Sequence, residues 1–445
     1  MSISNIIEIG RRSLFAQQSA INTTGRNIAN VNTIGYSRQR LNLRQDLTGV
    51  SYLGSFGKEA TTQIRQTFTD LQIWRENSLL GQYNNDAAVL AQIQDVFAEP
   101  TDAGITNLMT EFWNSWNDLS NDPDSETAKI IVRDKAIQLS NGFNRVHGEL
   151  INHNNQIHLE MEDKVIQIND TIEQIASLNQ QILNTDDHSL KDTRALLVDD
   201  LSQMVDISVA ETANGELNIA IGGMVVISGQ EVNKIKTQSI NLNGIWDSQI
   251  ELEDTQQKIN IAGGELGSLL KLQNEIIPNN IDELNTFALE FANKINEVHI
   301  DKTSWMPSGS ITFFDIGVTG AGDISVNQSF LDNPDLLGKV EEGGDAEFAQ
   351  TMFNLQNEKL LDNKTFGEFY NSIISGIGSK VNEANYLNEA QSMVLNKLEI
   401  DRMSVSGVSL DEEMTHMIQY EQAYNAAAKL VSTVDEMLSS ILNII

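Results

Sequence analysis

The six histidines are the residues best suited to metal or proton chemistry, and their spacing argues against it. His153 and His158 lie five positions apart, close to Glu149 and Glu160. Two ligands on one helical face need a spacing of four, as in the HExxH zinc motif. We therefore expect these histidines to lie on a solvated helix face and not to bind a metal.

Three other patterns share residue types with binding or catalytic motifs. The glycine-rich stretch 317–322 has no following P-loop lysine, so it predicts a turn and not a phosphate cradle. The acidic pairs at 199–200 and 341–342 lack the alternating ligands and glycine of a calcium loop. Trp113 and Trp116, three apart on a predicted helix, are typical of a core. The sequence thus predicts no catalytic site, no metal and no cofactor.

Composition narrows the class of protein further. The chain has 445 residues, a net charge of −33 and no cysteine. Such an acidic surface repels phosphate backbones, so nucleic acid is not an expected partner, and disulfides are impossible. No apolar run approaches the roughly 18 residues of a membrane span. The N-terminus is not expected to be a secretory signal, because no basic segment precedes its first apolar residues.

The charge balance of residues 1–75 differs from that of the rest of the chain, with nine Lys and Arg against four Asp and Glu. This basic segment is expected to meet acidic protein surface.

Both chain ends carry apolar residues at coiled-coil spacing. The N-terminal repeat is Ile7, Leu14, Ile21 and Ile28, with Ile3 in the companion position. The C-terminal repeat is Leu410, Met417, Tyr424, Val431, Leu438 and Ile445, with Tyr420, Val434 and Ile441 between them. Glu413 interrupts the C-terminal repeat. We expect helices over residues 3–30 and from about 409 to the end, and we call these apolar residues the assembly seam.

The two terminal helices could dock separately on a globular core or pair with each other. Their charges favour pairing, because residues 1–35 are net basic and residues 409–445 are net acidic. A pair of helices still leaves apolar surface exposed on its outer sides. The pattern therefore favours burial of that surface against neighbouring subunits.

The middle of the chain alternates between helical and strand patterns. Residues 70–98, 104–120 and 124–185 have helical periodicity, whereas 204–262 alternates like strands and contains hairpin turns. Helices resume after 263, with a short β-like piece at 311–326. The predicted fold is mainly α with inserted β, an elongated multi-domain protein with terminal helices paired as a coiled coil. The expected domains are 1–35 with 405–445, a helical rod of 36–203 with 263–404 that includes short β segments, and a β-rich outer module at 204–262.

Two motifs at opposite ends of the chain resemble one family. The stretch 27–38 is similar to the N-terminal signature of flagellar rod, hook and hook-associated axial proteins, and 406–413 to their C-terminal signature. The positions that carry the N-terminal motif are Asn27, Ala29, Asn30, Asn32, Thr33, Gly35 and Tyr36. The long helical segment 124–185 is more similar to the hook-associated members than to hook or distal rod proteins.

This resemblance implies a structural subunit of the bacterial flagellum and no enzymatic activity. It implies a ring of copies at the junction of hook and filament, required for filament assembly, with hook protein below and a second hook-associated junction protein above. It also implies export without a cleavable signal peptide and a cytoplasmic export chaperone at the C-terminal region. The alternatives are another axial flagellar protein, a secreted effector and a cytoplasmic coiled-coil scaffold.

Overall fold

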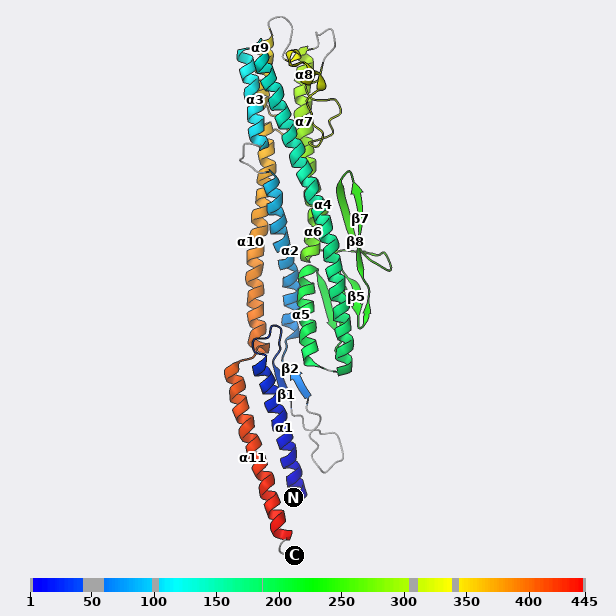
Figure 1. Cartoon of the computed structure of the whole chain (residues 1–445), viewed down its shortest axis with the longest axis vertical. Coiled ribbons are helices and arrows are strands. Elements are labelled where there is room, and N and C mark those ends of the chain that lie inside the picture. The colour runs from blue at the N-terminus through cyan, green and yellow to red at the C-terminus, as the bar shows by residue number, and fades with distance from the viewer. Residues whose placement is uncertain are drawn as a thin grey trace.

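The computed structural model shows an elongated molecule with both chain ends at the same tip (Figure 1). The structure describes residues 3–42, 60–97, 104–185, 187–303, 311–337 and 344–442. At this tip the two terminal helices, α1 (Ile3–Ala29) and α11 (Leu410–Leu442), run side by side. The predicted terminal helices and their pairing are therefore confirmed.

A bundle of long helices forms the body above this pair. Helix α4, with 60 residues, spans about 90 Å at 1.5 Å per residue. The bounds of the longer helices are α2 (Thr67–Phe97), α3 (Ile105–Asn121), α4 (Glu126–Thr185), α5 (His188–Met204), α7 (Ile277–Thr303) and α10 (Phe366–Ser406). The shorter ones are α6 (Gly264–Lys271), α8 (Gln328–Asp332) and α9 (Asp345–Asn354), with a π-helix at Leu272–Ile276 and 3-10 turns at Pro334–Leu336 and Leu355–Asn357.

Aromatic side chains concentrate in the core of the body far from the chain ends. Trp116 and Phe112 are fully buried, and their rings lie 6.3 Å apart at nearly a right angle. Phe291 and Phe313 contact the same cluster, at 5.8 and 6.0 Å from Phe112. Trp113 is also buried. The expectation that the two tryptophans are core residues is confirmed.

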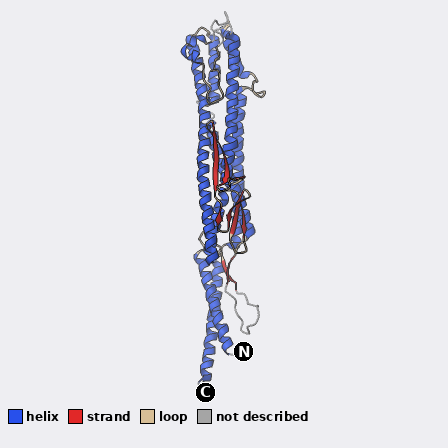
Figure 2. Ribbon diagram, turned by 90° about the vertical axis from the view of Figure 1, so that its right-hand side faces the viewer, coloured by secondary structure: helices blue, strands red, loops and turns tan. Residues whose placement is uncertain are grey.

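Two antiparallel sheets lie against the long helices at mid-height (Figure 2). The first has the order β3 (Ile207–Glu211), β4 (Leu217–Ile221), β5 (Met224–Ser228), β6 (Glu231–Val232). The second has the order β7 (Ile235–Leu242), β8 (Ile245–Leu252), β9 (Lys258–Ile259). In the second sheet Ile235 pairs with Leu252, and the register is continuous to Leu242 and Ile245. The predicted β-rich module at 204–262 contains all of these strands.

Two asparagines of α4, one buried and one half-buried, fasten the sheets to the helix. Asn179, fully buried, donates to the carbonyl oxygens of Leu217 (2.9 Å) and Gly229 (2.7 Å) and accepts from the Leu217 N–H (3.1 Å). Asn169 donates to the Ile235 carbonyl (2.8 Å) and accepts from its N–H (3.0 Å). An amide side chain carries the same kinds of donor and acceptor as the backbone, so it can pair with the backbone at the edge of a strand.

The stretch 311–326 is less strand-like than its sequence predicts. It contributes one isolated bridge, between Phe314 and Val326. The Asp323 carboxylate accepts hydrogen bonds from the N–H groups of Thr319 and Gly320, each at 2.9 Å, and Gly317 has a φ of 102°. These local bonds close a turn, which confirms the turn predicted at 317–322 and prevents an extended strand.

Candidate functional site

The two sequence motifs meet at the joint between the terminal helix pair and the body. A groove of about 680 Å³ lies at this joint. Its walls come from the turn after α1, from α5, and from the end of α10 with the start of α11. A small sheet of β1 (Gln39–Asn42) and β2 (Ala60–Gln63) adjoins it. Residues separated by almost the whole chain therefore build one site.

The inner face of the terminal pair is built from small side chains. Gly10, Ala16, Ala20 and Thr23 of α1 are buried. A Cβ atom added at Gly10 would lie 2.5 Å from Cγ2 of Val431, so the helices approach closely there. On α11 the buried positions are Glu413, Ala427 and Val434.

The residues of the predicted assembly seam flank this inner face. Ile7, Leu14, Ile21, Ile28, Met417, Tyr420, Val431 and Leu438 are half-buried, Val434 is buried, and Leu410 and Tyr424 are exposed. The side chains of Ile3 and Ile441, and the whole of Ile445, lie outside the described residues.

The outer surface of the pair is rich in large apolar side chains. Eight of them are 36–57% exposed: Ile9, Phe15, Leu410, Met414, Ile418, Tyr424, Leu430 and Met437. Single exposed apolar residues are ordinary, whereas eight large ones concentrated on two paired helices are typical of an interaction surface. We call these eight residues the outer apolar surface.

Asn27 is the central residue of the joint. Its amide nitrogen donates to the Gln39 carbonyl (2.9 Å) and to Oε2 of Glu413 (3.0 Å). Its amide oxygen accepts from the Tyr36 hydroxyl (2.9 Å) and the Gln39 N–H (3.0 Å). All four hydrogen-bonding positions of the side chain are thus used, and the residue is 1% exposed. An amide side chain supplies both the donors and the acceptor that these bonds use.

Arg38 ties the N-terminal motif to α11. Its Nε donates to Oε1 of Glu413 (2.7 Å), its Nη1 to Oε2 of Glu412 (2.9 Å), and its backbone N–H to the Ser406 carbonyl (2.8 Å). Burial alone would lower the pKa of Arg38, but the bonds and charges of the two glutamates raise it. The bond from Arg38 lowers the pKa of Glu412. Glu413, which interrupts the apolar repeat, is therefore a buried anchor.

The turn after α1 docks on α5. Gly35 has a φ of +78°, and a Cβ there would lie 2.6 Å from Leu196, so the turn needs glycine for both reasons. Two residues further on, the Ser37 N–H donates to Oδ2 of Asp192 on α5 (3.3 Å). Burial raises the pKa of Asp192, and burial raises the pKa of Tyr36 to about 12.

The other motif residues lie at the surface of this turn. Asn30 donates to the Arg26 carbonyl (2.9 Å) and accepts from the Thr33 hydroxyl (3.3 Å). Ala29, Asn32 and Thr33 are exposed. The motif therefore combines a buried half, centred on Asn27, with an exposed half that shapes the turn.

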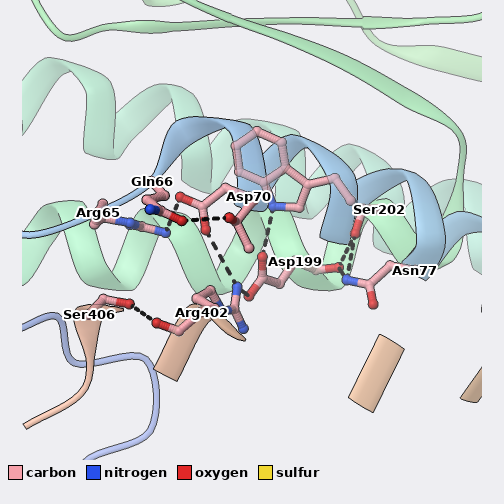
Figure 3. Close-up of polar contacts among 10 residues, drawn as sticks. Arg65, Gln66, Asp70, Asn77, Asp199, Ser202, Arg402 and Ser406 are labelled. Atoms are coloured by element: carbon pink, nitrogen blue, oxygen red, sulfur yellow. Dashed lines mark hydrogen bonds and ion pairs between the residues drawn. The ribbon is translucent and has the colours of Figure 1, made fainter. Parts of the chain in front are cut away.

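A second polar cluster holds the end of α10 against the body (Figure 3). Arg402 Nη1 lies 2.9 Å from Oδ2 of Asp199 on α5 and 3.8 Å from Oδ1 of Asp70 on α2. Asp70 also pairs with Arg65 at 3.2 Å, and the Trp74 indole N–H donates to Asp199 at 2.7 Å. One arginine thus fixes three helices next to the joint.

The residues considered from sequence as possible metal ligands do not form a metal site among the described residues. His158 is nearly buried and stacks on Trp246, with ring centroids 4.1 Å apart. The expectation of a solvated face was therefore wrong for His158. Among the described residues, no three His, Cys, Asp or Glu side chains gather as a metal site. Within the same residues no helix is long and apolar enough to cross a membrane.

Several joint residues were missed from sequence. The roles of Arg402, Asp199 and Asp192 in the joint gave no sequence signal, because their partners come from distant segments. Glu413 did give one, since a single charge inside an apolar repeat is a known device for fixing helix register.

Comparisons with known proteins match both ends and the middle of the chain. Residues 7–36 match the family model "Flagella basal body rod protein", and 402–444 match "Flagellar basal body rod FlgEFG protein C-terminal". Residues 90–304 match "Flagellar hook-associated protein FlgK helical domain". The ends, and the joint that they build, therefore define an axial protein of the flagellum.

Full-length relatives identify the family within this class. The chain is 31% identical to flagellar hook-associated protein 1 of Bacillus subtilis, over 98% of this chain and 97% of that protein. It is 22% identical to the protein of the same name from Salmonella typhimurium, over 99% and 100%. The chain belongs to the flagellar hook-associated protein 1 family, and its role is a structural one at the junction of hook and filament.

A solved structure supports the fold. The flagellar hook junction protein FlgK from Burkholderia pseudomallei superposes with a TM-score of 0.66 at 15% identity, covering 75% of this chain and 100% of that one. This likeness confirms the elongated, mainly α architecture with inserted β-structure. The alignments with the relatives extend over 497 and 555 positions, so those proteins carry segments that this chain lacks.

Proposed function

We propose that copies of this chain form a ring between hook and filament, and that the paired terminal helices are its assembly element. The outer apolar surface carries this proposal. A half-exposed side chain of this size gains roughly 1 kcal/mol on burial, so eight provide on the order of 8 kcal/mol before the entropic cost of association. Contacts with adjacent copies and with hook protein would bury this surface.

The division of the chain follows from the same proposal. Residues 1–35 with 405–445 would be the assembly domain, 36–203 with 263–404 the rod, and 204–262 the outer module. The joint described above links the first to the second. Its buried bonds from Asn27 and Arg38 to Glu413 connect both motifs, so an assembled terminal pair would hold the rod at a defined angle.

Partners and export form the finer part of the proposal. Hook protein would lie below the ring and a second hook-associated junction protein above it. A cytoplasmic export chaperone would cover the C-terminal region before export, because α11 carries six of the eight exposed apolar residues. Export would be in an unfolded form without signal cleavage, and the lack of cysteine fits this route.

Deletion of the gene tests the ring. Cells should keep hooks, lose filaments and release filament protein into the medium, and re-expression of the chain should restore filaments. Normal filaments in the deletion strain would overturn the proposal.

Limited proteolysis tests the assembly element, because terminal helices with unburied apolar surface should be trimmed first, to about residues 35–405. Resistant ends in the purified monomer would favour a preformed scaffold.

The competing functions are separable. A hook or distal rod protein would share the matched ends, but the match over 90–304 is to the hook-associated helical domain. A secreted effector would leave filament growth unchanged when deleted. The relatives found are structural flagellar proteins, and we propose that this chain likewise has no catalytic activity.

A further inference from the structure

The outer faces of the two terminal helices carry opposite charge. On α1, Arg11, Phe15 and Arg26 share the face turned away from α11, since they are four and fifteen residues apart, and all three are exposed. On α11, Ile418, Glu421 and Glu436 lie on the face turned away from α1, and all three are exposed. One outer face is therefore basic and apolar, and the other is acidic and apolar.

These two faces cannot meet within one chain. Each helix turns its inner face to its partner, so the outer faces point in opposite directions. The register also forbids it: Asn27 bonds to Glu413, and Gly10 lies against Val431, which places Arg26 about seven residues from the level of Glu421. Within the described residues, the surface that matches in charge and apolar character is therefore that of a second copy.

The spacing of the charges matches. Arg11 and Arg26 are fifteen residues apart, and so are Glu421 and Glu436. In an antiparallel alignment both pairs, Arg26 with Glu421 and Arg11 with Glu436, form at once, and Lys429 then lies opposite the neutral Gln18. The neighbour must be displaced along the helix axis by about seven residues, roughly 10 Å.

Resting on the proposed assembly function, we propose that the outer face of α1 in one copy packs antiparallel on the outer face of α11 in the next copy, with Arg26–Glu421 and Arg11–Glu436 as its charge pairs. The contact is heterologous, so each copy uses both faces and the array extends to a ring or a helical turn. Packing of α1 on α1 would place arginine against arginine, and α11 on α11 glutamate against glutamate, which like-charge repulsion disfavours.

The present partners of these groups do not oppose the contact. Arg11 lies 3.1 Å from Glu8, and its side chain is 62% exposed, so this surface pair is weak and can exchange. Within the described part of the chain, Arg26, Glu421 and Glu436 lie in no ion pair.

Cross-linking in the assembled flagellum tests the contact directly. The chain has no cysteine, so Arg26→Cys with Glu421→Cys in the full chain introduces the only two thiols. Hooks with attached filaments are isolated from a deletion strain that expresses this variant, oxidised, and run on a non-reducing gel. The expected result is a ladder of covalent multimers beyond the dimer, with no dimer from either single variant.

A ladder would support the contact. Monomers alone from fully assembled flagella would overturn it, and so would dimers from Arg26→Cys alone, which would indicate α1 on α1. Such a failure leaves the junction function standing, because the flagella are assembled in this experiment.

Charge reversal gives a second measurement that needs no cross-link. Arg26→Glu or Glu421→Arg alone should reduce the number of filament-bearing hooks about tenfold through like-charge repulsion, and the two together should restore it to within about twofold. Lys429→Glu is the matched control on the same face, with little expected effect. Single reversals without effect, or a double reversal without recovery while both variants are exported, would refute the pairing.

Discussion

Replacing Arg402 with methionine should loosen the body next to the joint without unfolding it. The arginine lies between Asp199 and Asp70, at 2.9 and 3.8 Å, and its side chain is 26% exposed while theirs are 16% and 8% exposed. Methionine keeps most of the side-chain volume but removes the charge and the donors. The loss of stability in this variant therefore reports the ionic contacts and not a cavity.

The magnitude follows from what the two carboxylates retain. Asp199 keeps the Trp74 indole N–H at 2.7 Å, and Asp70 keeps Arg65 at 3.2 Å. Neither carboxylate becomes an orphaned buried charge, so the cost should be that of lost charge-assisted bonds, about 2 kcal/mol, and not the 3–5 kcal/mol of a broken buried pair. Because the cluster is partly buried, added salt should weaken the effect only slightly.

Amide hydrogen exchange measures this locally. Peptides that cover the end of α10 and the start of α2 should exchange about 30-fold faster, the equivalent of 2 kcal/mol in the opening equilibrium. The matched control is Lys397→Met on the same helix, whose pair with Asp401 at 2.8 Å is exposed. That variant should change exchange by no more than about twofold. Equal effects from the two variants, or faster exchange throughout the chain, would refute the reasoning.

Three further changes test other parts of the fold. Gly81→Ala places a Cβ 2.2 Å from the Gln203 carbonyl and should cost about 2 kcal/mol or more in urea unfolding, whereas Gly376→Ala, with open space around it, should stabilise by about 0.5–1 kcal/mol. Asn179→Ala removes its bonds to Leu217 of β4 and to Gly229 in the turn between β5 and β6, and should cost about 3 kcal/mol, with faster exchange in β4. Burial lowers the pKa of His299 to about 4, so the unfolded chain binds the proton first as pH falls below about 6.5. Stability should therefore drop by about 2 kcal/mol between pH 7 and pH 5, and His299→Asn should lose less over the same range.

Periodicity predicted the elements of this fold well. Apolar spacing located the terminal helices and the 60-residue α4, and strand alternation located the module at 204–262, because each pattern is local. The stretch 311–326 was misjudged, because side-chain bonds from Asp323 to Thr319 and Gly320 close a turn that alternation cannot reveal.

The joint was predictable only in part. The motifs gave Asn27 and Gly35, and the structure supplies their reasons, a fully bonded amide and a left-handed turn against Leu196. The ion pairs of Arg402 and Arg38 join segments hundreds of residues apart, so nothing in the local pattern indicates them. The face of α1 against α11 was also obscured, because small residues such as Gly10 and Ala20 permit the close approach while the larger seam residues flank it.

The most direct test of the central claim is retention of an outer-face variant on hooks. The full chain with Phe15→Ser, Met414→Ser and Ile418→Ser keeps the inner contacts of the terminal pair and loses part of the outer apolar surface. Expressed in a deletion strain, it should be exported into the medium but absent from isolated hooks, and filaments should not grow. Recovery of the variant on hooks at the level of the unaltered chain, with normal filaments, would contradict the account.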